Sequence, residues 1–259
     1  MSAESDQSRI VLVTGGAKGI GRGISEQFLI AGVTVLVCGR NAPETLPGAD
    51  GRNVEFIAAD LKDNDSIDAL MNEIEQRYGR LDVLINNAGG SPFAMADATS
   101  ARYNESIIRL NLLSPFYLSQ KANALMQQQD SGGVIINICS VSGLRPSPGT
   151  AAYGAAKAGL LNLTQTLAVE WAPKVRTVAI SPGLIRTEQS HLHYGDEDGI
   201  AAVAKTVPQG RLGLPEEIGQ ACVWLSSDSA SYANGSNLVL HGGGERPAFL
   251  DAAAVNKGD

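Results

Sequence analysis

The chain has 259 residues, of which 44% are hydrophobic and 18% are charged, and its formal net charge at pH 7 is -7. This composition is typical of a globular protein with a hydrophobic core. The excess of acidic residues excludes the basic surface that nucleic acids and anionic membranes require. The expected partners are therefore small molecules or other protein chains, with no nucleic acid and no membrane.

The three cysteines, Cys38, Cys139 and Cys222, are far apart in the sequence and form no CxxC pair. They predict neither a disulfide framework nor a zinc site, and we expect reduced thiols packed in the interior. No metal site is predicted. The first eight residues, MSAESDQS, are polar and acidic, which is not typical of a targeting signal. No apolar run reaches the roughly 18 residues that span a bilayer, so we expect a cytoplasmic protein.

Seven short, apolar, β-branched segments predict strands, at residues 9–14, 33–38, 53–58, 81–86, 133–139, 175–180 and 237–242. Their nearly continuous hydrophobicity is typical of strands buried on both faces. Helical spacing appears between them, for instance in the apolar stripe of Ile67, Leu70, Met71 and Ile74. This alternation predicts an α/β fold, a doubly wound parallel sheet of Rossmann type with helices on both faces and the strand order 3-2-1-4-5-6-7.

We find no internal repeat, linker or shift in composition, so residues 1–259 are expected to form a single domain. The longest segment outside the alternation runs from about residue 184 to 214. Long excursions at the carboxyl end of a strand are typical of lids over a binding site, and a mobile loop is the alternative. The tail at 243–259 extends past the last strand, and a subunit contact is the one role we suggest for it.

The segment VTGGAKGIGRGI follows the first strand and opens a helix. Gly15, Gly19 and Gly21 lack side chains where the backbone turns tightly, which lets a pyrophosphate approach the helix N-terminus and its free N–H groups. The spacing is GxxxGxG rather than GxGxxG. Because such sheets bind ligands beside the first strand, the turn predicts a dinucleotide site.

The second strand ends at Gly39, where a carboxylate is expected if the bound ribose carries a free 2′-hydroxyl. Arg40 follows it, and Lys18 lies in the glycine turn. Two cations there favour a 2′-phosphate, although both side chains are also typical of a solvated surface. The sequence therefore favours NADP(H) over NAD(H).

Five motifs occur in order along the chain: TGGAKGIG, NNAG at 86–89, Asn111 in LNLLSPF, Ser140 with the YxxxK pair Tyr153 and Lys157, and SPGLIRT ending at Thr187. Together they resemble the short-chain dehydrogenase/reductase family over nearly the whole chain, most of all its 3-oxoacyl-[acyl carrier protein] reductases and related carbonyl reductases. One departure is Val178, which stands where members of the family often have asparagine.

The resemblance implies catalysis by Asn111, Ser140, Tyr153 and Lys157. Tyr153 would exchange a proton with the substrate oxygen, Ser140 would donate a hydrogen bond to that oxygen, and Asn111 would anchor a water. Lys157 would hold the nicotinamide ribose. Because Lys157 follows Tyr153 by one helical turn, a charge about 4 Å away should lower the pKa of Tyr153 from about 10 to near 7. A turn or cap role is the alternative for Ser140.

The resemblance also implies which residues contact the dinucleotide. They come from the glycine turn, the ends of the next strands, the catalytic helix and the PG-motif: Gly15, Ala17, Lys18, Gly19, Ile20, Gly21, Arg40, Asp60, Leu61, Asn87, Ala88, Gly89, Tyr153, Lys157, Pro182, Gly183, Ile185 and Thr187. Asp60 could in addition cap the following helix. His191 and His193 are expected at the surface.

The implied activity is hydride transfer between NADP(H) and a carbonyl or secondary alcohol. The substrate classes left open are a 3-oxoacyl thioester, a steroid or alicyclic ketone, and a sugar-derived ketone. The alternatives are the same enzyme using NAD(H), and a nucleotide-binding regulator that has lost catalysis. The resemblance also implies a homodimer or homotetramer built on the catalytic helix and its neighbour. The alternative is an internal helix with a face of small residues, which here are Ala151, Ala152, Ala155, Ala156, Ala158 and Gly159.

Overall fold

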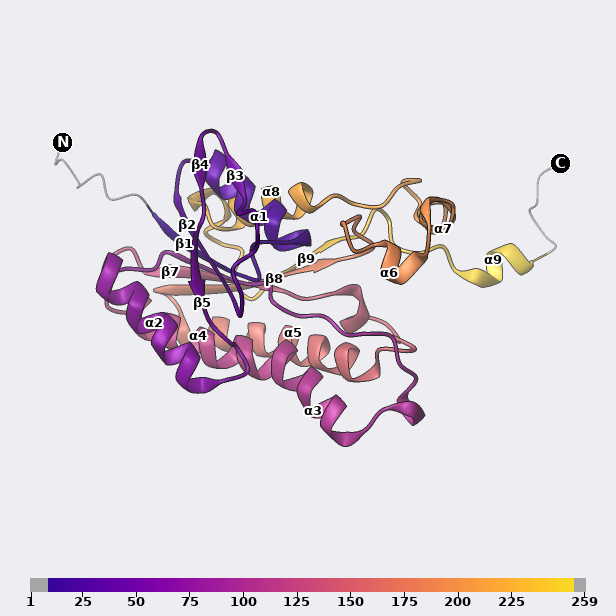
Figure 1. Cartoon of the computed structure of the whole chain (residues 1–259), viewed down its shortest axis with the longest axis horizontal. Coiled ribbons are helices and arrows are strands. Elements are labelled where there is room, and N and C mark those ends of the chain that lie inside the picture. The colour runs from indigo at the N-terminus through magenta and orange to yellow at the C-terminus, as the bar shows by residue number, and fades with distance from the viewer. Residues whose placement is uncertain (1–8, 254–259) are drawn as a thin grey trace.

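Helices cover both faces of one parallel sheet (Figure 1). The computed structural model describes residues 9–253, so the expectations for residues 1–8 and for the end of the tail at 254–259 lie outside the described residues. Sheet order is β5-β2-β1-β6-β7-β8-β9, and every neighbouring pair is parallel. Numbered by their place in the chain, these strands give the predicted order 3-2-1-4-5-6-7, and the predicted fold class is confirmed.

The strands of this sheet are β1 (Ile10–Thr14), β2 (Thr34–Gly39), β5 (Glu55–Ala58), β6 (Val83–Asn86), β7 (Gly133–Ile138), β8 (Val175–Pro182) and β9 (Asn237–Leu240). The helices are α1 (Gly19–Ile30), α2 (Asn64–Tyr78), α3 (Ala101–Ile108), α4 (Ser114–Met126), α5 (Ala151–Trp171), α6 (His191–Tyr194), α7 (Glu197–Ala204), α8 (Pro215–Leu225) and α9 (Ala248–Ala252). Short helical turns complete the list: η1 (Ala96–Ala98), η2 (Arg109–Leu113), η3 (Val141–Gly143) and η4 (Asp228–Ala230).

Successive side chains of each strand enter two different core layers. Val11 and Val13 of β1 pack with Ile24 and Phe28 of α1 and with Ile218 of α8. Residues of the opposite parity, such as Leu12 and Leu36, pack against α2 and α4, where the predicted stripe of α2 is buried. Burial on both faces explains why the strands are apolar without alternation. The three cysteines are free and buried, as predicted.

Two local features differ from the expectations. The segment before β5 forms a small antiparallel hairpin, β3 (Gly48–Ala49) with β4 (Arg52–Asn53), so the predicted strand at 53–58 is shorter than expected. The N-cap of α2 is Asp63, whose side chain accepts a hydrogen bond from the backbone of Asp65, and the cap suggested for Asp60 is wrong.

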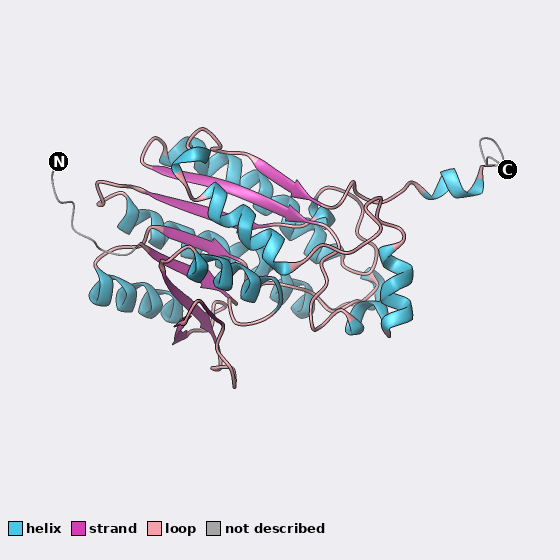
Figure 2. Cartoon of the chain, turned by 90° about the horizontal axis from the view of Figure 1, so that it is seen from above, coloured by secondary structure: helices cyan, strands magenta, loops and turns pink. Residues whose placement is uncertain are grey.

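The segment at 184–214 folds back on itself over the carboxyl end of the sheet. It contains α6 and α7, and Ile185 near its start forms a bridge with Gly213 near its end. Ile200, Val207 and Leu212 give it a small core of its own. The tail runs along this segment, and α9 lies beyond it, away from the sheet (Figure 2). No helix in residues 9–253 is long and apolar enough to cross a membrane.

Candidate active site

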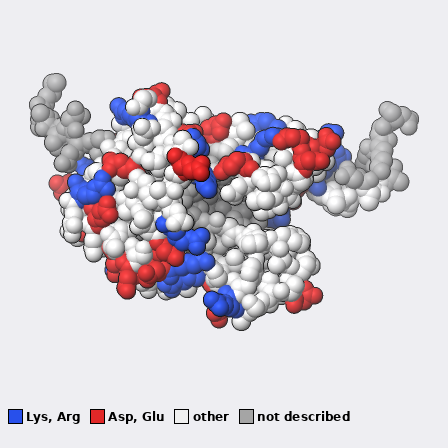
Figure 3. Space-filling view, in the orientation of Figure 1, with Lys and Arg blue, Asp and Glu red and all other residues white. Residues whose placement is uncertain are grey.

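A cavity of about 650 Å³ opens along the carboxyl edge of the central strands. Figure 3 shows a hollow on the same side of the molecule, with acidic and basic side chains interspersed around it. Most of the sequence-predicted cofactor residues line this cavity: Gly15, Ala17, Lys18, Gly19, Ile20, Gly21, Arg40, Asn87, Ala88, Gly89, Tyr153, Lys157 and Thr187. The structure thus brings the glycine turn, the NNAG segment and the YxxxK pair to one place.

The glycine turn has the geometry that a phosphate cradle needs. Gly15 and Gly19 have φ angles of 61° and 50°, values that favour glycine over other residues. A Cβ at position 21 would lie 2.3 Å from the carbonyl oxygen of Gly15. Any side chain there would therefore force the turn away from the N-terminus of α1.

An anionic group already lies at this helix terminus. The backbone N–H of Gly19, the first residue of α1, donates to Oε1 of Glu188 at 3.0 Å. Glu188 directly follows Thr187, which lines the cavity. Helix N-termini attract anions through their free N–H groups and dipole, and this carboxylate occupies such a position. The residues present therefore fit a dinucleotide with its pyrophosphate at the glycine turn.

The end of β2 forms the far wall of the cavity. Gly39 brings no carboxylate there, and Arg40 and Lys18 both line the space with exposed side chains. Within the described part of the chain, neither cation has a side-chain hydrogen bond or an ion pair. Both remain available for an anionic group on a ligand.

Tyr153 lies in the first turn of α5, and Lys157 lies one turn later with its side chain buried. Nζ of Lys157 donates to the carbonyl oxygen of Ile138 at 2.8 Å and lies 5.6 Å from the centre of the Tyr153 ring. Ser140 follows β7 and caps η3 by accepting a hydrogen bond from the backbone of Ser142 at 3.1 Å. Ser140 therefore acts as a helix cap, the alternative given for it from the sequence, and its hydroxyl also interacts with Tyr153.

The electrostatics of this pair differ from the expectation. Burial raises the pKa of Tyr153, although its hydrogen bond with Ser140 acts in the opposite direction. Burial lowers the pKa of Lys157 to about 8. The expected lowering of the Tyr153 pKa is therefore not found, because burial deprives the phenolate of its hydration. At neutral pH Tyr153 is a protonated acid.

Asn111 is fully buried in η2, a π-helical turn between α3 and α4. Such turns recur at functional sites. Its side chain donates to the carbonyl oxygens of Gly90 and Ile107 at 3.0 and 2.9 Å, and accepts from the backbone of Gly90 at 2.9 Å. A Cβ at Gly89 would lie 2.5 Å from Oδ1 of Asn111 and 3.5 Å from Nζ of Lys157. The amide and the ammonium therefore converge on one glycine.

Five predicted cofactor residues do not line the cavity. The carboxylate of Asp60 turns back to accept from the backbone of Lys62 at 3.0 Å, and Leu61 is buried in the core. Pro182 is the last residue of β8, and a Cβ at Gly183 would meet His241 at 2.7 Å.

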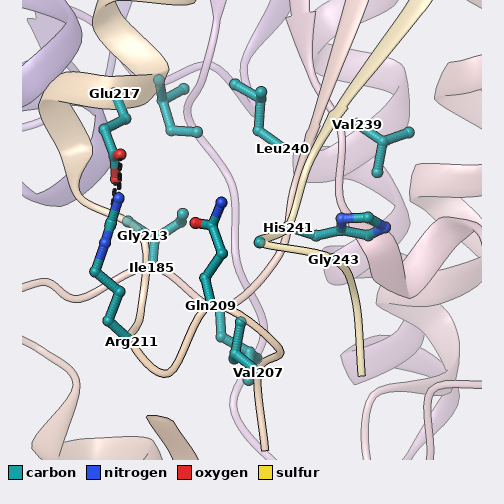
Figure 4. Close-up of a pocket in the computed structure, with 13 residues that line it drawn as sticks. Ile185, Val207, Gln209, Arg211, Gly213, Glu217, Val239, Leu240, His241 and Gly243 are labelled. Carbon is teal, nitrogen blue, oxygen red and sulfur yellow. Dashed lines mark hydrogen bonds and ion pairs between the residues drawn. The ribbon is translucent and has the colours of Figure 1, made fainter. Parts of the chain in front are cut away.

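The fifth residue, Ile185, lines a second cavity of about 410 Å³ behind the PG-motif. Figure 4 shows Ile185 there with Gly213, Gln209 and Leu240.

The cavity beside the glycine turn is also lined by residues that the sequence did not identify. They lie in β2, β5 or β7, or they follow β2, β6 or Thr187: Cys38, Asn41, Ala42, Pro43, Phe56, Gly90, Ile138 and Gln189. For all but Phe56, a position near a strand end or after the PG-motif is the signal that could have identified the residue, because parallel strands bring those ends to one edge.

Comparisons with known proteins agree with this geometry. A family model described as enoyl-(acyl carrier protein) reductase matches residues 15–245. A 3-oxoacyl-[acyl-carrier-protein] reductase of Chlamydia trachomatis is 36% identical over 244 residues, which cover 91% of this chain and 97% of that protein. A probable 2,4-dienoyl-CoA reductase of Bacillus subtilis is 35% identical over 246 residues, 92% of this chain and 96% of that protein.

Among solved structures, the ligand-free aldohexose dehydrogenase of Thermoplasma acidophilum matches with a TM-score of 0.85 and 28% identity, covering 98% of both chains. The motifs, the sheet order and these relatives lead to one assignment. The chain belongs to the short-chain dehydrogenase/reductase family, and it is an NAD(P)-dependent oxidoreductase of carbonyl and CH–OH groups.

Proposed function

We propose that the chain is an NADP(H)-dependent enzyme that reduces ketones or oxidises the corresponding secondary alcohols, with Asn111, Ser140, Tyr153 and Lys157 as its catalytic residues. The observation that carries the proposal is the meeting of Tyr153 and Lys157 in the cavity that the glycine turn also lines. A regulator that only binds nucleotides has no need of a phenol placed beside that buried ammonium.

In the proposed reduction, the Tyr153 hydroxyl gives its proton to the carbonyl oxygen of the substrate. Ser140, which interacts with that hydroxyl, donates a hydrogen bond to the same oxygen and stabilises its developing charge. The ammonium of Lys157 stabilises the phenolate that Tyr153 becomes. When bound, the nicotinamide supplies or accepts the hydride at the carbon that reacts.

NADP(H) is favoured over NAD(H) by the charges at the end of β2. Gly39 provides no carboxylate for a free 2′-hydroxyl, while Arg40 and Lys18 line the same space. A guanidinium pairs with a phosphate through two parallel hydrogen bonds. A bound 2′-phosphate would therefore lie near two cations, and β2 would present no carboxylate to repel it.

The proposed substrate is a 3-oxoacyl thioester or another apolar ketone. Exposed large apolar side chains lie on the segments that follow the carboxyl ends of β6, β7 and β8, namely Phe93, Met95, Leu144 and Leu192. Two relatives are named for acyl carrier protein and acyl-CoA compounds. We also propose that the segment at 184–214 acts as the lid over this substrate.

The test is a screen of both reduced coenzymes against 3-oxoacyl thioesters, alicyclic and steroid ketones and sugar-derived ketones, following the absorbance of the reduced nicotinamide. We expect turnover with NADPH and an apolar ketone, and a higher kcat/KM with NADPH than with NADH. Coenzyme binding without turnover in any class would favour the regulator, and faster turnover with NADH would overturn the coenzyme choice.

A further inference from the structure

Buried hydrogen bonds join α4, β6, β7 and α5 on one face of the sheet. Nδ2 of Asn86 donates to Oγ of Ser119 at 2.9 Å and to Oδ1 of Asn137 at 2.8 Å. Nδ2 of Asn137 in turn donates to Oγ1 of Thr164 in α5 at 2.9 Å. Each of these four side chains is at most 2% exposed. The bonds therefore lie in a dry region, where polar contacts are strong and directional.

Asn234 links α5 to β8, because it donates to the carbonyl oxygen of Ala168 at 2.9 Å and accepts from the backbone of Thr177 at 2.9 Å. The packing face of α5 offers few other contacts that fix its position along the sheet. Apart from Lys157 and Thr164, its buried residues are small or aliphatic: Gly154, Ala156, Leu160, Leu167 and Ala168. Apolar contacts are non-directional. In residues 9–253, only Asn137–Thr164 and Lys157–Ile138 are side-chain hydrogen bonds between α5 and β7.

These two contacts act on the same side of the helix. Lys157 and Thr164 are seven residues apart, which is about two turns of an α-helix. Ile138, which accepts from Lys157, directly follows Asn137, which donates to Thr164. A shift of α5 that breaks the Thr164 contact therefore also displaces the ammonium of Lys157 and the hydroxyl of Tyr153.

We propose that the Asn137–Thr164 hydrogen bond is a positioning contact, which holds α5 in the register that places Tyr153 and Lys157 for catalysis. The proposal rests on the proposed function of those two residues. Neither Asn137 nor Thr164 lines the cavity, so both act on the reaction only through the elements that carry them, β7 and α5.

Two threonines of α5 provide a matched pair for the test. Thr164 and Thr166 both donate to the carbonyl oxygen four residues earlier, at 2.7 and 3.1 Å, but Thr166 is exposed and receives no bond from Asn137. Thr164→Val removes the positioning contact, Thr166→Val removes only a helix back-bond, and Thr164→Ser restores the hydroxyl.

Thr164→Val should lower kcat about tenfold, since small displacements of catalytic groups have effects of this size or larger. The KM for the ketone should stay within about twofold, as expected when the loss occurs mainly in the transition state. The alkaline limb of the pH profile for reduction should move to lower pH, because Lys157 loses the carbonyl that stabilises its charge. Thr164→Ser and Thr166→Val should behave as the wild type.

A wild-type kcat and pH profile in Thr164→Val, or an equal loss in Thr166→Val, would overturn the proposal. Hydrogen exchange provides a measurement that does not depend on turnover. The backbone amides of 133–140 and 151–160 should exchange faster in Thr164→Val than in Thr166→Val, and equal rates in the two variants would overturn the proposal. If the wild type reduces no ketone, the proposed function fails and exchange alone decides. If Thr164→Val does not fold, Thr164→Ala is measured in its place.

Discussion

Gly89 shows how one missing side chain shapes the site. Because position 89 carries no Cβ, the amide of Asn111 and the ammonium of Lys157 both approach the backbone there. Lys157 is buried and hydrogen-bonded to the carbonyl oxygen of Ile138, so its ammonium has a fixed position and does not move with the Tyr153 hydroxyl. The positions of these residues could be predicted from motifs, but the burial that sets their pKa values depends on the folded environment.

Glu188 provides a prediction for coenzyme affinity. Its carboxylate accepts from Gly19, where we expect the pyrophosphate. Glu188→Gln removes a negative charge from that place, so NADPH should bind about two- to fivefold more tightly, in line with charge effects at helix termini. Titration of the intrinsic fluorescence gives the dissociation constant.

The control for this experiment is Glu216→Gln, an exposed carboxylate in the first turn of α8 that lines, together with Glu188, a separate cavity of about 470 Å³. Unchanged or weaker binding in Glu188→Gln would show that the carboxylate does not compete with the coenzyme.

The tail and the loop after Ser140 are joined by an ion pair between Arg145 and Glu245. A Cβ at Gly242 or Gly243 would meet Val207 or Pro208 of the 184–214 segment at 2.8 or 2.9 Å. Tyr194, at the end of α6, interacts electrostatically with both charged groups, although burial is the main cause of its raised pKa. The tail therefore connects the proposed lid to the loop after Ser140.

We expect Glu245→Gln to raise the KM for the ketone about two- to fivefold with kcat unchanged, because an exposed ion pair contributes less than about 1 kcal/mol. The effect should disappear at high salt, which screens exposed charges. Steady-state kinetics at low and high salt provide the measurement, with the exposed Glu170→Gln of α5 as the control. A KM that does not respond to Glu245→Gln would rule out this role for the tail.

The sheet was predictable because its strands are short, apolar and bounded by turns. The exact ends of the strands were less predictable from the sequence. Three consecutive glycines with positive φ, Gly242, Gly243 and Gly244, turn the chain away, so β9 ends at Leu240 instead of 242. The hairpin of β3 and β4 lies in a polar segment that carries no strand pattern. Phe56 reaches the cavity only because β5 pairs with β2, which is a tertiary fact.

The buried lysine and thiols make the stability of the whole molecule depend on pH. The pKa of Lys157 is about 8 in the folded protein and about 10.4 when unfolded. Between these values the unfolded chain binds more protons, so this residue makes the free energy of unfolding increase with pH. Burial raises the pKa of Cys38 and of Cys139 to about 12, and these thiols have the opposite effect above about pH 8.5.

Comparison with Lys157→Met isolates the lysine, because the thiols are common to both proteins. From pH 8 to 10 the wild type should gain stability relative to the variant, by up to about 1.4 kcal/mol per pH unit. Urea unfolding at a series of pH values measures the difference. A difference that stays constant over this range would mean that Lys157 keeps an ordinary pKa in the folded state.

The central claim is that Tyr153 protonates a ketone while NADPH, bound in the cavity beside it, delivers the hydride. The direct measurement uses NADPH deuterated at the transferred position, with the wild type and with Tyr153→Phe, and follows deuterium at the carbinol carbon together with coenzyme binding. The wild type should transfer the label. Tyr153→Phe should bind NADPH equally well and transfer it roughly 100- to 10,000-fold more slowly. Label transfer by Tyr153→Phe at the wild-type rate would contradict the account.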